Sequence, residues 1–176
     1  MTLGAFGYGT LVNRHTHSYG GHAARLPGWQ RVWQTTSARP AAFLSAAPAP
    51  GVEVMGLHFT PGAEDWPGLA AREAHYDKIS IAEFGSPTVV YSVPERHLTA
   101  GRAPILRSYL DTVLQGFLLE FGEDGPRHFM ATTVGWERGI FDDRADRIYP
   151  RASIPTPAQT AQFAALLAST PVVQQL

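Results

Sequence analysis

The stretch from residue 6 to residue 14 reads Phe6-Gly7-Tyr8-Gly9-Thr10-Leu11-Val12-Asn13-Arg14. Two glycines flank a tyrosine and precede a hydroxyl residue and two aliphatic residues. Glycine weakens a strand, because it loses more backbone entropy on folding and has no side chain to pack. Its use at two such close positions indicates that the backbone takes a positive φ here or that another group approaches it closely. We therefore expect a short strand over residues 5–11 that ends in a glycine turn.

This turn is a candidate anion site. The backbone N–H groups of Gly9, Thr10 and Leu11 can converge into a concavity that binds a carboxylate or an oxyanion. The sequence contains neither the P-loop pattern GxxxxGK[ST] nor the dinucleotide fingerprint GxGxxG, so it does not indicate a nucleotide phosphate site. A tight strand exit without a ligand explains the same residues equally well.

The composition is that of a globular protein. Of 176 residues, 44% are hydrophobic and 16% are charged, which argues against disorder and allows a single domain over residues 1–176. The formal net charge of −1 provides no basic surface for nucleic acid or an anionic membrane. The absence of cysteine excludes disulfides, thiolate catalysis and cysteine-ligated zinc. No stretch approaches the ~20 apolar residues of a membrane span, and the N-terminus lacks a signal-peptide pattern, so we expect a cytoplasmic protein.

Strands and helices alternate irregularly along the chain. A turn at residues 27–28 leads into a predicted strand that ends near residue 36, and further strands are predicted at 43–45, 52–60, 78–82 and 88–93. The segment 46–51, AAPAPG, is predicted to be a turn or a loose connection. This order predicts an α+β fold with a mixed, curved or barrel-like sheet and helices packed around it.

Three helices are predicted. The first is short and begins at Asp65 as its cap, with Trp66 and Pro67 in its first turn. The longest covers 104–121, where aliphatic and aromatic residues recur with helical spacing. The last begins after the cap Thr156 and ends near Ser169, and the stretch before it, rich in Asp and Arg, is predicted to be irregular.

Glu73 is the most informative side chain of the first helix. Trp66, Leu69, Ala70 and Glu73 follow the spacing i, i+3, i+4 and i+7, which places them on one face. A carboxylate on an apolar face loses solvent, which raises its pKa and suits it to general acid–base chemistry. A rotated helix, or an ion pair between Glu73 and Arg72, explains the same pattern structurally.

Other chemistry has weaker support. His15, His17 and His22 lie in a predicted loop, and no HExxH or comparable metal motif is present, so a solvated or hydrogen-bonding role is expected. A serine hydrolase is not indicated, because the chain has no GxSxG elbow. The tryptophans are expected to lie in the core or in a pocket wall, namely Trp29, Trp33 and Trp136.

Several segments, taken in order, resemble the gamma-glutamylcyclotransferase-like superfamily over roughly residues 5–122. The family's tyrosine-glycine-serine-leucine loop corresponds to Tyr8-Gly9-Thr10-Leu11, and a Gly-Trp-x-Arg strand entry follows at residues 28–31. The strand with an internal glycine and the short acid-bearing helix of the family resemble residues 54–57 and 69–73. TVVYSV (88–93) and PILRSYLDTVLQG (104–116) continue the match. The order and spacing of these segments, rather than any one motif, carry the resemblance.

The resemblance implies intramolecular aminolysis of a small γ-glutamyl substrate. The α-amine of the γ-glutamyl group attacks its own γ-carbonyl, giving 5-oxoproline and a released amine or amino acid, and no cofactor or metal is required. Glu73 is the implied general acid and base, because one group must take the proton of the α-ammonium and return it to the leaving nitrogen. The implied substrate-binding residues are Tyr8, Gly9, Thr10, Leu11, Tyr76, Tyr91 and Tyr109.

Two features depart from the family pattern. Thr10 stands where serine is commoner, which keeps the hydroxyl and adds a methyl group. The C-terminal third, including Tyr149-Pro150-Arg151, has no counterpart in the best-known members, which leaves the leaving-group side of the substrate open. A non-catalytic ligand-binding module with the same fold is the alternative, because a fold alone does not establish an activity.

Overall fold

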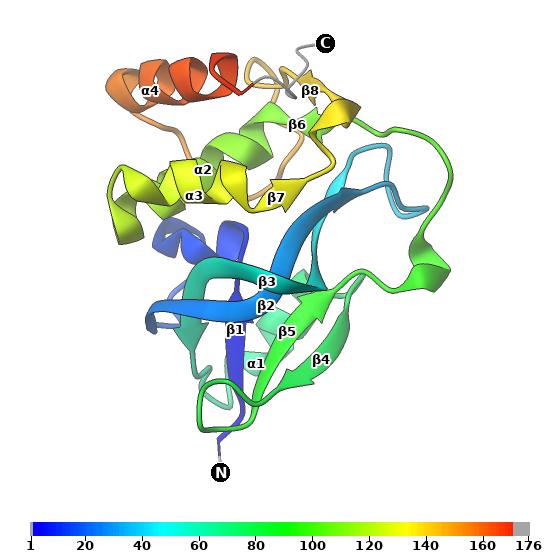
Figure 1. The fold of residues 1–176 in the computed structure, drawn as a ribbon, viewed down its shortest axis with the longest axis vertical. Coiled ribbons are helices and arrows are strands. Elements are labelled where there is room, and N and C mark those ends of the chain that lie inside the picture. The colour runs from blue at the N-terminus through cyan, green and yellow to red at the C-terminus, as the bar shows by residue number, and fades with distance from the viewer. Residues whose placement is uncertain (1, 171–176) are drawn as a thin grey trace.

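A mixed β-sheet forms the centre of the protein. The structure, a computed structural model, describes residues 2–170 (Figure 1). The main sheet has the strand order β4-β5-β1-β3-β2-β7, in which β1 is parallel to β5 and β2 is parallel to β7, whereas the other neighbours are antiparallel. Its strands are β1 (Gly4–Gly7), β2 (His22–Gln34), β3 (Phe43–Phe59), β4 (Asp77–Ile81), β5 (Thr88–Ser92) and β7 (Thr133–Val134).

A second, two-stranded sheet and the helices complete the fold. The small sheet pairs β6 (Ile105–Leu106) with β8 (Ile140–Phe141). Within residues 2–170 the α-helices are α1 (Trp66–Arg72), α2 (Arg107–Phe121), α3 (Asp124–Ala131) and α4 (Pro157–Ala168), and the 3-10 turns are η1 (Thr10–Val12), η2 (Arg14–Thr16), η3 (Glu95–His97) and η4 (Trp136–Arg138). The predicted α+β class with a mixed sheet is confirmed. Because β4 and β7 lie at opposite edges of the described sheet, it does not close into a barrel.

The strands β2 and β3 form one long, bent hairpin (Figure 1). The turn or loose connection predicted at residues 46–51 is wrong, because β3 continues through it as strand, although residues 49–52 form a bulge opposite Gly28 that pairs with no residue of β2. Its prolines are tolerated there, because Pro50 lies in this bulge and Pro48, which pairs with Trp29 of β2, lies in a part of β3 that β1 does not reach. β2 also begins earlier than predicted. The turn expected at residues 27–28 is instead an irregularity within the strand at Gly28, where φ is +77°.

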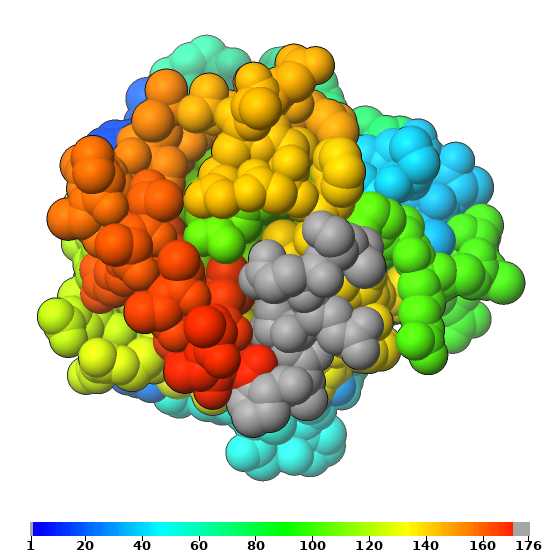
Figure 2. Space-filling view, turned by 90° about the horizontal axis from the view of Figure 1, so that it is seen from above, coloured from blue at the N-terminus to red at the C-terminus, as the bar shows by residue number. Residues whose placement is uncertain are grey.

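The helices α2, α3 and α4 gather at one end of the molecule, away from α1 (Figure 1). Seen from above, α4 and the segment 142–156 spread over this face (Figure 2). The predicted start of the long helix is wrong by three residues, because Ile105–Leu106 pair with β8 before α2 begins. The region predicted to be irregular contains α3, where Phe129 and Met130 are buried. The cap of α4 is as predicted: Thr156 accepts from the Gln159 N–H, and the Gln159 side chain completes a capping box.

The core lies between the main sheet and α2. Trp33 is 1% exposed, and its ring meets the edges of Tyr109 and Trp136 with centroids 5.7 Å away. Trp29 and Trp136 are buried as well, which agrees with the expectation that the tryptophans belong to the core. Within residues 2–170, every helix falls short of the length and apolar character that a membrane crossing needs.

Candidate active site

The turn after β1 presents unpaired backbone donors. The chain leaves β1 at Gly7 and enters η1, in which the carbonyl of Gly9 accepts from the Val12 N–H at 3.0 Å. The first N–H groups of a helical turn have no partner within it. Accordingly, the N–H groups of Gly9, Thr10 and Leu11 donate no hydrogen bond to another described residue. These are the donors that the sequence predicted for an anion.

The two glycines of the turn are needed for close approach and not for a positive φ. Gly9 has φ −125°, and Gly7 also lies outside the positive-φ region, so of the two explanations that the sequence left open, close approach of another group applies here. A Cβ atom at Gly7 would lie 2.5 Å from the Leu11 Cβ. At Gly9 a Cβ atom would lie 2.9 Å from the Tyr109 hydroxyl and 3.1 Å from the Leu44 Cδ2. A side chain at either position would therefore collide with the wall of the turn.

A buried guanidinium supports this turn from behind. Arg31 is fully buried, and its Nε donates to the Tyr8 carbonyl at 2.8 Å while its Nη groups donate to the Met55 carbonyl and, at 2.7 Å, to the Thr132 hydroxyl. Burial lowers the pKa of Arg31 to about 9, which leaves it charged at neutral pH. Because C=O and N–H point in opposite directions across a trans peptide, the Gly9 N–H points away from Arg31. The guanidinium thus fixes and polarises the peptide unit that carries the first unpaired donor.

Glu73 approaches the turn from the end of α1. It is the C-cap residue, one position beyond the helix, and its N–H still donates to the Leu69 carbonyl at 3.0 Å. The side chain is 13% exposed and Leu69 is fully buried, whereas Ala70 is exposed, so only part of the predicted face points inward. Asp65 precedes the helix as predicted but does not cap it, because its carboxylate accepts from the Gly62 N–H at 3.1 Å.

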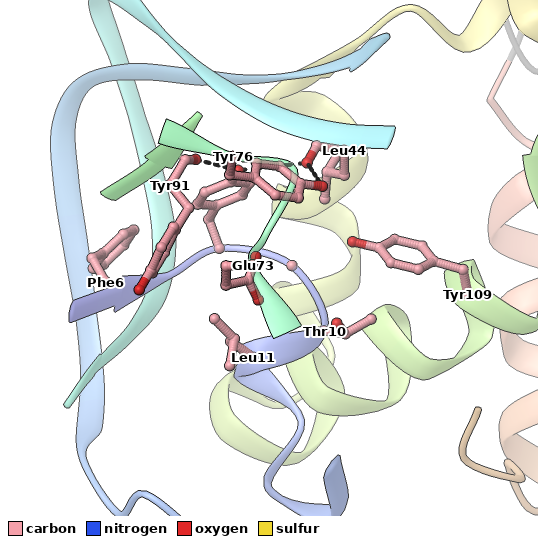
Figure 3. A pocket seen from close by; sticks show the side chains of 10 residues that line it. Phe6, Thr10, Leu11, Leu44, Glu73, Tyr76, Tyr91 and Tyr109 are labelled. Atoms are coloured by element: carbon pink, nitrogen blue, oxygen red, sulfur yellow. Dashed lines mark hydrogen bonds between the residues drawn. The ribbon is translucent and has the colours of Figure 1, made fainter. Parts of the chain in front are cut away.

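An inner cavity of about 30 Å³ lies between the turn and Glu73. Figure 3 shows the Glu73 carboxylate pointing into this space and the Tyr109 hydroxyl pointing toward it from α2. The structure brings all the sequence-predicted site residues together around this cavity. It also adds Phe6 and Leu44, which sequence reasoning missed. The full lining is Phe6, Tyr8, Gly9, Thr10, Leu11, Leu44, Glu73, Tyr76, Tyr91 and Tyr109.

The four tyrosines of the cavity fall into two pairs. The hydroxyl of Tyr8 donates to the Tyr91 carbonyl at 2.5 Å, and the hydroxyl of Tyr76 donates to the Leu44 carbonyl at 3.0 Å (Figure 3). In contrast, the Tyr91 hydroxyl is buried without a partner among the described residues, and the Tyr109 hydroxyl lies against Gly9. Burial is the main cause that raises the pKa of the Tyr91 hydroxyl above its usual value, and the charge of Glu73 is the second. The hydroxyl is therefore a neutral donor at pH 7.

The protonation of Glu73 is set by two opposing effects. Burial raises the pKa of its carboxyl from 4.5 to about 7, and the positive charges of Arg72 and Arg151 act against this rise. The Nε of Arg72 lies 3.4 Å from the Glu73 Oε1, so the ion pair considered from the sequence is present, yet burial outweighs it. With a pKa near 7, both protonation states are populated at neutral pH, which suits a group that must take and return a proton.

A larger outer cavity of about 120 Å³ adjoins the inner one and shares Thr10, Glu73, Tyr76 and Tyr109 with it. The remaining lining residues come from segments distant in sequence, and most of them were missed by sequence reasoning: Arg39, Phe43, Arg72, His75, Tyr149 and Arg151. Tyr149 links the two cavities, since its hydroxyl lies 2.9 Å from the Thr10 hydroxyl. No local pattern marks Arg39 or Arg151, because each reaches the cavity only through the fold.

His17 and His22 contact different groups. The Nε2 of His17 lies 2.7 Å from the Leu11 carbonyl oxygen, and its ring stacks on Tyr19 with centroids 4.7 Å apart. His22 begins β2 and lies beside His58, with ring centroids 5.3 Å apart. In residues 2–170 no group of three or more His, Asp and Glu side chains is placed to hold a metal ion. His17 therefore braces the turn through the carbonyl of Leu11.

Comparison with solved structures supports the architecture. A structure described as gamma-glutamyl cyclotransferase aligns with a TM-score of 0.58 over 94% of this chain and 99% of that chain, at 12% identity. The chain has the gamma-glutamyl cyclotransferase fold. An uncharacterized protein from Homo sapiens aligns equally well, with a TM-score of 0.58 over 90% of this chain and 95% of that chain, also at 12% identity.

A third match is the structure of YkqA from Bacillus subtilis, with a TM-score of 0.52 and 18% identity over 76% of this chain and 56% of that chain. At these identities the likeness concerns the fold, and it confirms the resemblance drawn from the sequence at that level. No protein-family model and no curated protein matches the sequence.

Proposed function

We propose that this protein is a γ-glutamyl cyclotransferase, which converts a small γ-glutamyl compound to 5-oxoproline and a released amine. One observation carries the proposal: a sheltered carboxyl with a pKa of about 7 faces the unpaired amides of residues 9–11 across a single cavity. The fold of the gamma-glutamyl cyclotransferases is the framework around that cavity.

The amides of the turn bind the substrate's α-carboxylate. Hydrogen bonds from Gly9, Thr10 and Leu11 to this carboxylate are charge-assisted, and the Arg31 guanidinium behind the Tyr8 carbonyl adds a favourable field. Held at this end, the glutamyl chain bends so that its α-nitrogen meets its own γ-carbonyl carbon. Ring closure then benefits from the high effective concentration of two groups in one molecule.

Glu73 moves the proton that the reaction requires. Its carboxylate takes a proton from the α-ammonium, and the freed amine forms a new bond to the γ-carbon. The resulting tetrahedral intermediate collapses, and the bond from the γ-carbon to the leaving nitrogen breaks as Glu73 returns the proton to that nitrogen. The former α-nitrogen then gives up its second proton to Glu73, which passes it to the released amine, so that the products are the neutral ring amide and an ammonium. The atoms balance without water, because the α-amine replaces the leaving amine on the same carbonyl.

The tyrosines have two roles in this mechanism. Tyr8 and Tyr76 position the cavity, because their hydroxyls bind the backbone of β5 and β3. Tyr91 and Tyr109 bind the substrate, because both line the cavity and the buried Tyr91 hydroxyl has no partner among the described residues.

The test is a panel of γ-glutamyl compounds incubated with the protein, with 5-oxoproline measured by mass spectrometry. We expect 5-oxoproline to form with the unmodified protein and not with Glu73→Gln, which still binds the substrate by calorimetry. Binding of γ-glutamyl compounds without 5-oxoproline in the unmodified protein would support the ligand-binding module instead. Absence of both binding and turnover would overturn the site itself.

A further inference from the structure

The segment between β8 and α4 contacts the candidate site although it forms neither helix nor strand. Its residues 142–154 are here called the strap. Asp143 and Tyr149 are the two buried residues of the strap, 3% and 6% exposed. Because the strap has no helical or sheet hydrogen bonds of its own, contacts of these side chains with the rest of the protein fix its course.

Asp143 ties the strap to the start of α2. Its Oδ1 accepts from the Ser108 N–H at 2.7 Å, and its Oδ2 accepts from the Ser108 hydroxyl and, at 3.0 Å, from the Ile148 N–H. The first N–H groups of a helix have no partner within it, so this carboxylate caps α2. The same carboxylate holds the residue directly before Tyr149.

Tyr149 and Ser153 hold the two ends of η1. The Tyr149 hydroxyl lies 2.9 Å from the Thr10 hydroxyl, and its ring meets the Tyr109 ring edge-to-face with centroids 4.9 Å apart. Four residues later in the strap, the Ser153 Oγ accepts from the Asn13 Nδ2 at 3.2 Å. Asn13 is fully buried and directly follows η1. The strap therefore contacts the turn that carries the unpaired amides at both of its ends.

The Thr10 hydroxyl connects the strap to Glu73. An arginine side chain can only donate, so the Thr10 Oγ1 accepts from the Arg72 Nη2 at 2.9 Å, besides its hydrogen bond with Tyr149. The Nε of Arg72 in turn lies 3.4 Å from the Glu73 Oε1. Two partners, one next to Glu73 and one on the strap, thus fix the residue whose N–H is the middle one of the three unpaired donors. Donors that are fixed before a ligand arrives bind an anion without a cost of reorganisation.

We infer that the strap holds the turn in the conformation that binds the substrate's α-carboxylate, with Tyr149 as a positioning residue that acts through Thr10. The inference rests on the proposed function, because this carboxylate is the anion assigned there to the turn. Ring closure does not change the charge of the α-carboxylate, so the turn binds it equally before and during the reaction. A loosened turn should therefore weaken substrate binding and leave the chemical step nearly unaffected.

Tyr149→Phe removes one hydroxyl and keeps the ring against Tyr109. We expect KM for γ-glutamyl-alanine to rise roughly three- to tenfold, the size of one hydrogen bond, with kcat within about twofold of the unmodified protein. An analogue whose glutamyl α-carboxylate is replaced by a neutral carboxamide tests the anion directly, and released alanine measures turnover of both compounds. The preference for the carboxylate, expressed as a ratio of kcat/KM values, should narrow by a similar factor in Tyr149→Phe.

A double variant tests whether Tyr149 acts through Thr10. Thr10→Val removes the hydroxyl and nearly keeps the shape of the side chain, so Tyr149→Phe should change KM little further in that background. Thr156→Ala is the matched control, because it removes the cap of α4 at a cost of about 1 kcal/mol. Among the described residues its hydroxyl binds only the Gln159 N–H, so this variant should leave KM and the ratio unchanged.

The outcomes separate this inference from the proposed function. An unchanged KM and ratio in Tyr149→Phe, or a fall in kcat alone, would overturn the inference while 5-oxoproline release upheld the cyclotransferase. Equal changes in Thr156→Ala would also overturn it, because they would indicate a general loosening of the fold. So would a full further rise in KM when Tyr149→Phe is added to Thr10→Val. No 5-oxoproline from any γ-glutamyl compound of the panel would overturn the proposed function, and the inference with it.

Discussion

The inner and outer cavities share Glu73 but surround it with opposite environments. The inner side is aromatic, aliphatic and closely packed, whereas the outer side is lined by arginines. Burial on the inner side raises the pKa of the carboxyl, and the outer arginines restrain that rise, so the value is about 7. The difference teaches that the pKa of one carboxyl is set jointly by the two spaces, because burial on the inner side raises it and charge on the outer side lowers it.

The largest expected effect comes from removing the proton-transfer group of the inner cavity, Glu73. Glu73→Gln keeps the shape of the side chain but cannot exchange a proton, so we expect kcat to fall by about 10²–10⁴-fold or more while the substrate dissociation constant stays similar. Kinetics with γ-glutamyl-alanine and calorimetry measure the two quantities. Glu64→Gln, an exposed acid shortly before α1, should behave as the unmodified protein. An equal fall in kcat in both variants would contradict the role proposed for Glu73.

The same substitution should increase stability at high pH. The folded-state pKa of Glu73, about 7, lies above its ordinary 4.5, so its contribution to stability is complete below pH 4.5 and is lost as the pH rises through 7. A neutral glutamine avoids that loss, and the variant should gain on the order of 3 kcal/mol relative to the parent above pH 7. Urea unfolding at pH 5 and pH 8 gives both values. A difference that is the same at both pH values would show that Glu73 is not perturbed by burial.

A bulkier residue at position 9 should obstruct the inner cavity. Gly9→Val places carbon atoms where the Tyr109 hydroxyl and the Leu44 side chain lie, and such overpacking costs about 1–3 kcal/mol of folding stability. The added carbons also fill space beside the unpaired amides, so ligand binding should be weaker. Calorimetry with the substrate and a thermal melt separate loss of binding from loss of folding. Gly68→Ala on α1 is the control, because nothing but the Tyr19 hydroxyl lies within 4.0 Å of the added methyl group. Unchanged affinity in Gly9→Val would argue against an anion at the turn.

The smallest expected effect probes the influence of the outer cavity on the inner one. As a base, Glu73 is active when ionised, so kcat/KM should rise as the pH increases through about 7. Arg151→Gln removes a charge that lowers the pKa, so this rise should move upward by roughly a few tenths of a pH unit. A γ-glutamyl compound with an uncharged leaving group is the substrate of choice, because that group can form no ion pair with Arg151 that the substitution would remove. Arg147→Gln, also exposed, is the control, and a shift of equal size there would point to net charge instead.

Local patterns in the sequence carried much of the fold. The capping box at Thr156 and Gln159 depends on neighbours within one turn, so it could be predicted from four consecutive residues. The strands β4 and β5 lie within one residue of their predicted bounds, because their β-branched and aromatic residues also form a local pattern. The break expected at residues 46–51 failed because proline is tolerated or excluded according to the neighbouring strand, which the local sequence does not show.

The sequence by itself determined two features of the inner cavity. One is the turn at Gly7 and Gly9, where the backbone carries no side chain, and the other is an acid, Glu73, four residues after Leu69. Only the tertiary structure decided that Glu73 faces the unpaired amides, and that close contact, rather than a positive φ, requires the glycines. It alone brought Arg39 and Arg151 to one cavity, from either side of α2 in the chain. The physical reason is that burial and charge act through space, so the pKa of a carboxyl depends on groups from any part of the sequence that the fold brings near it.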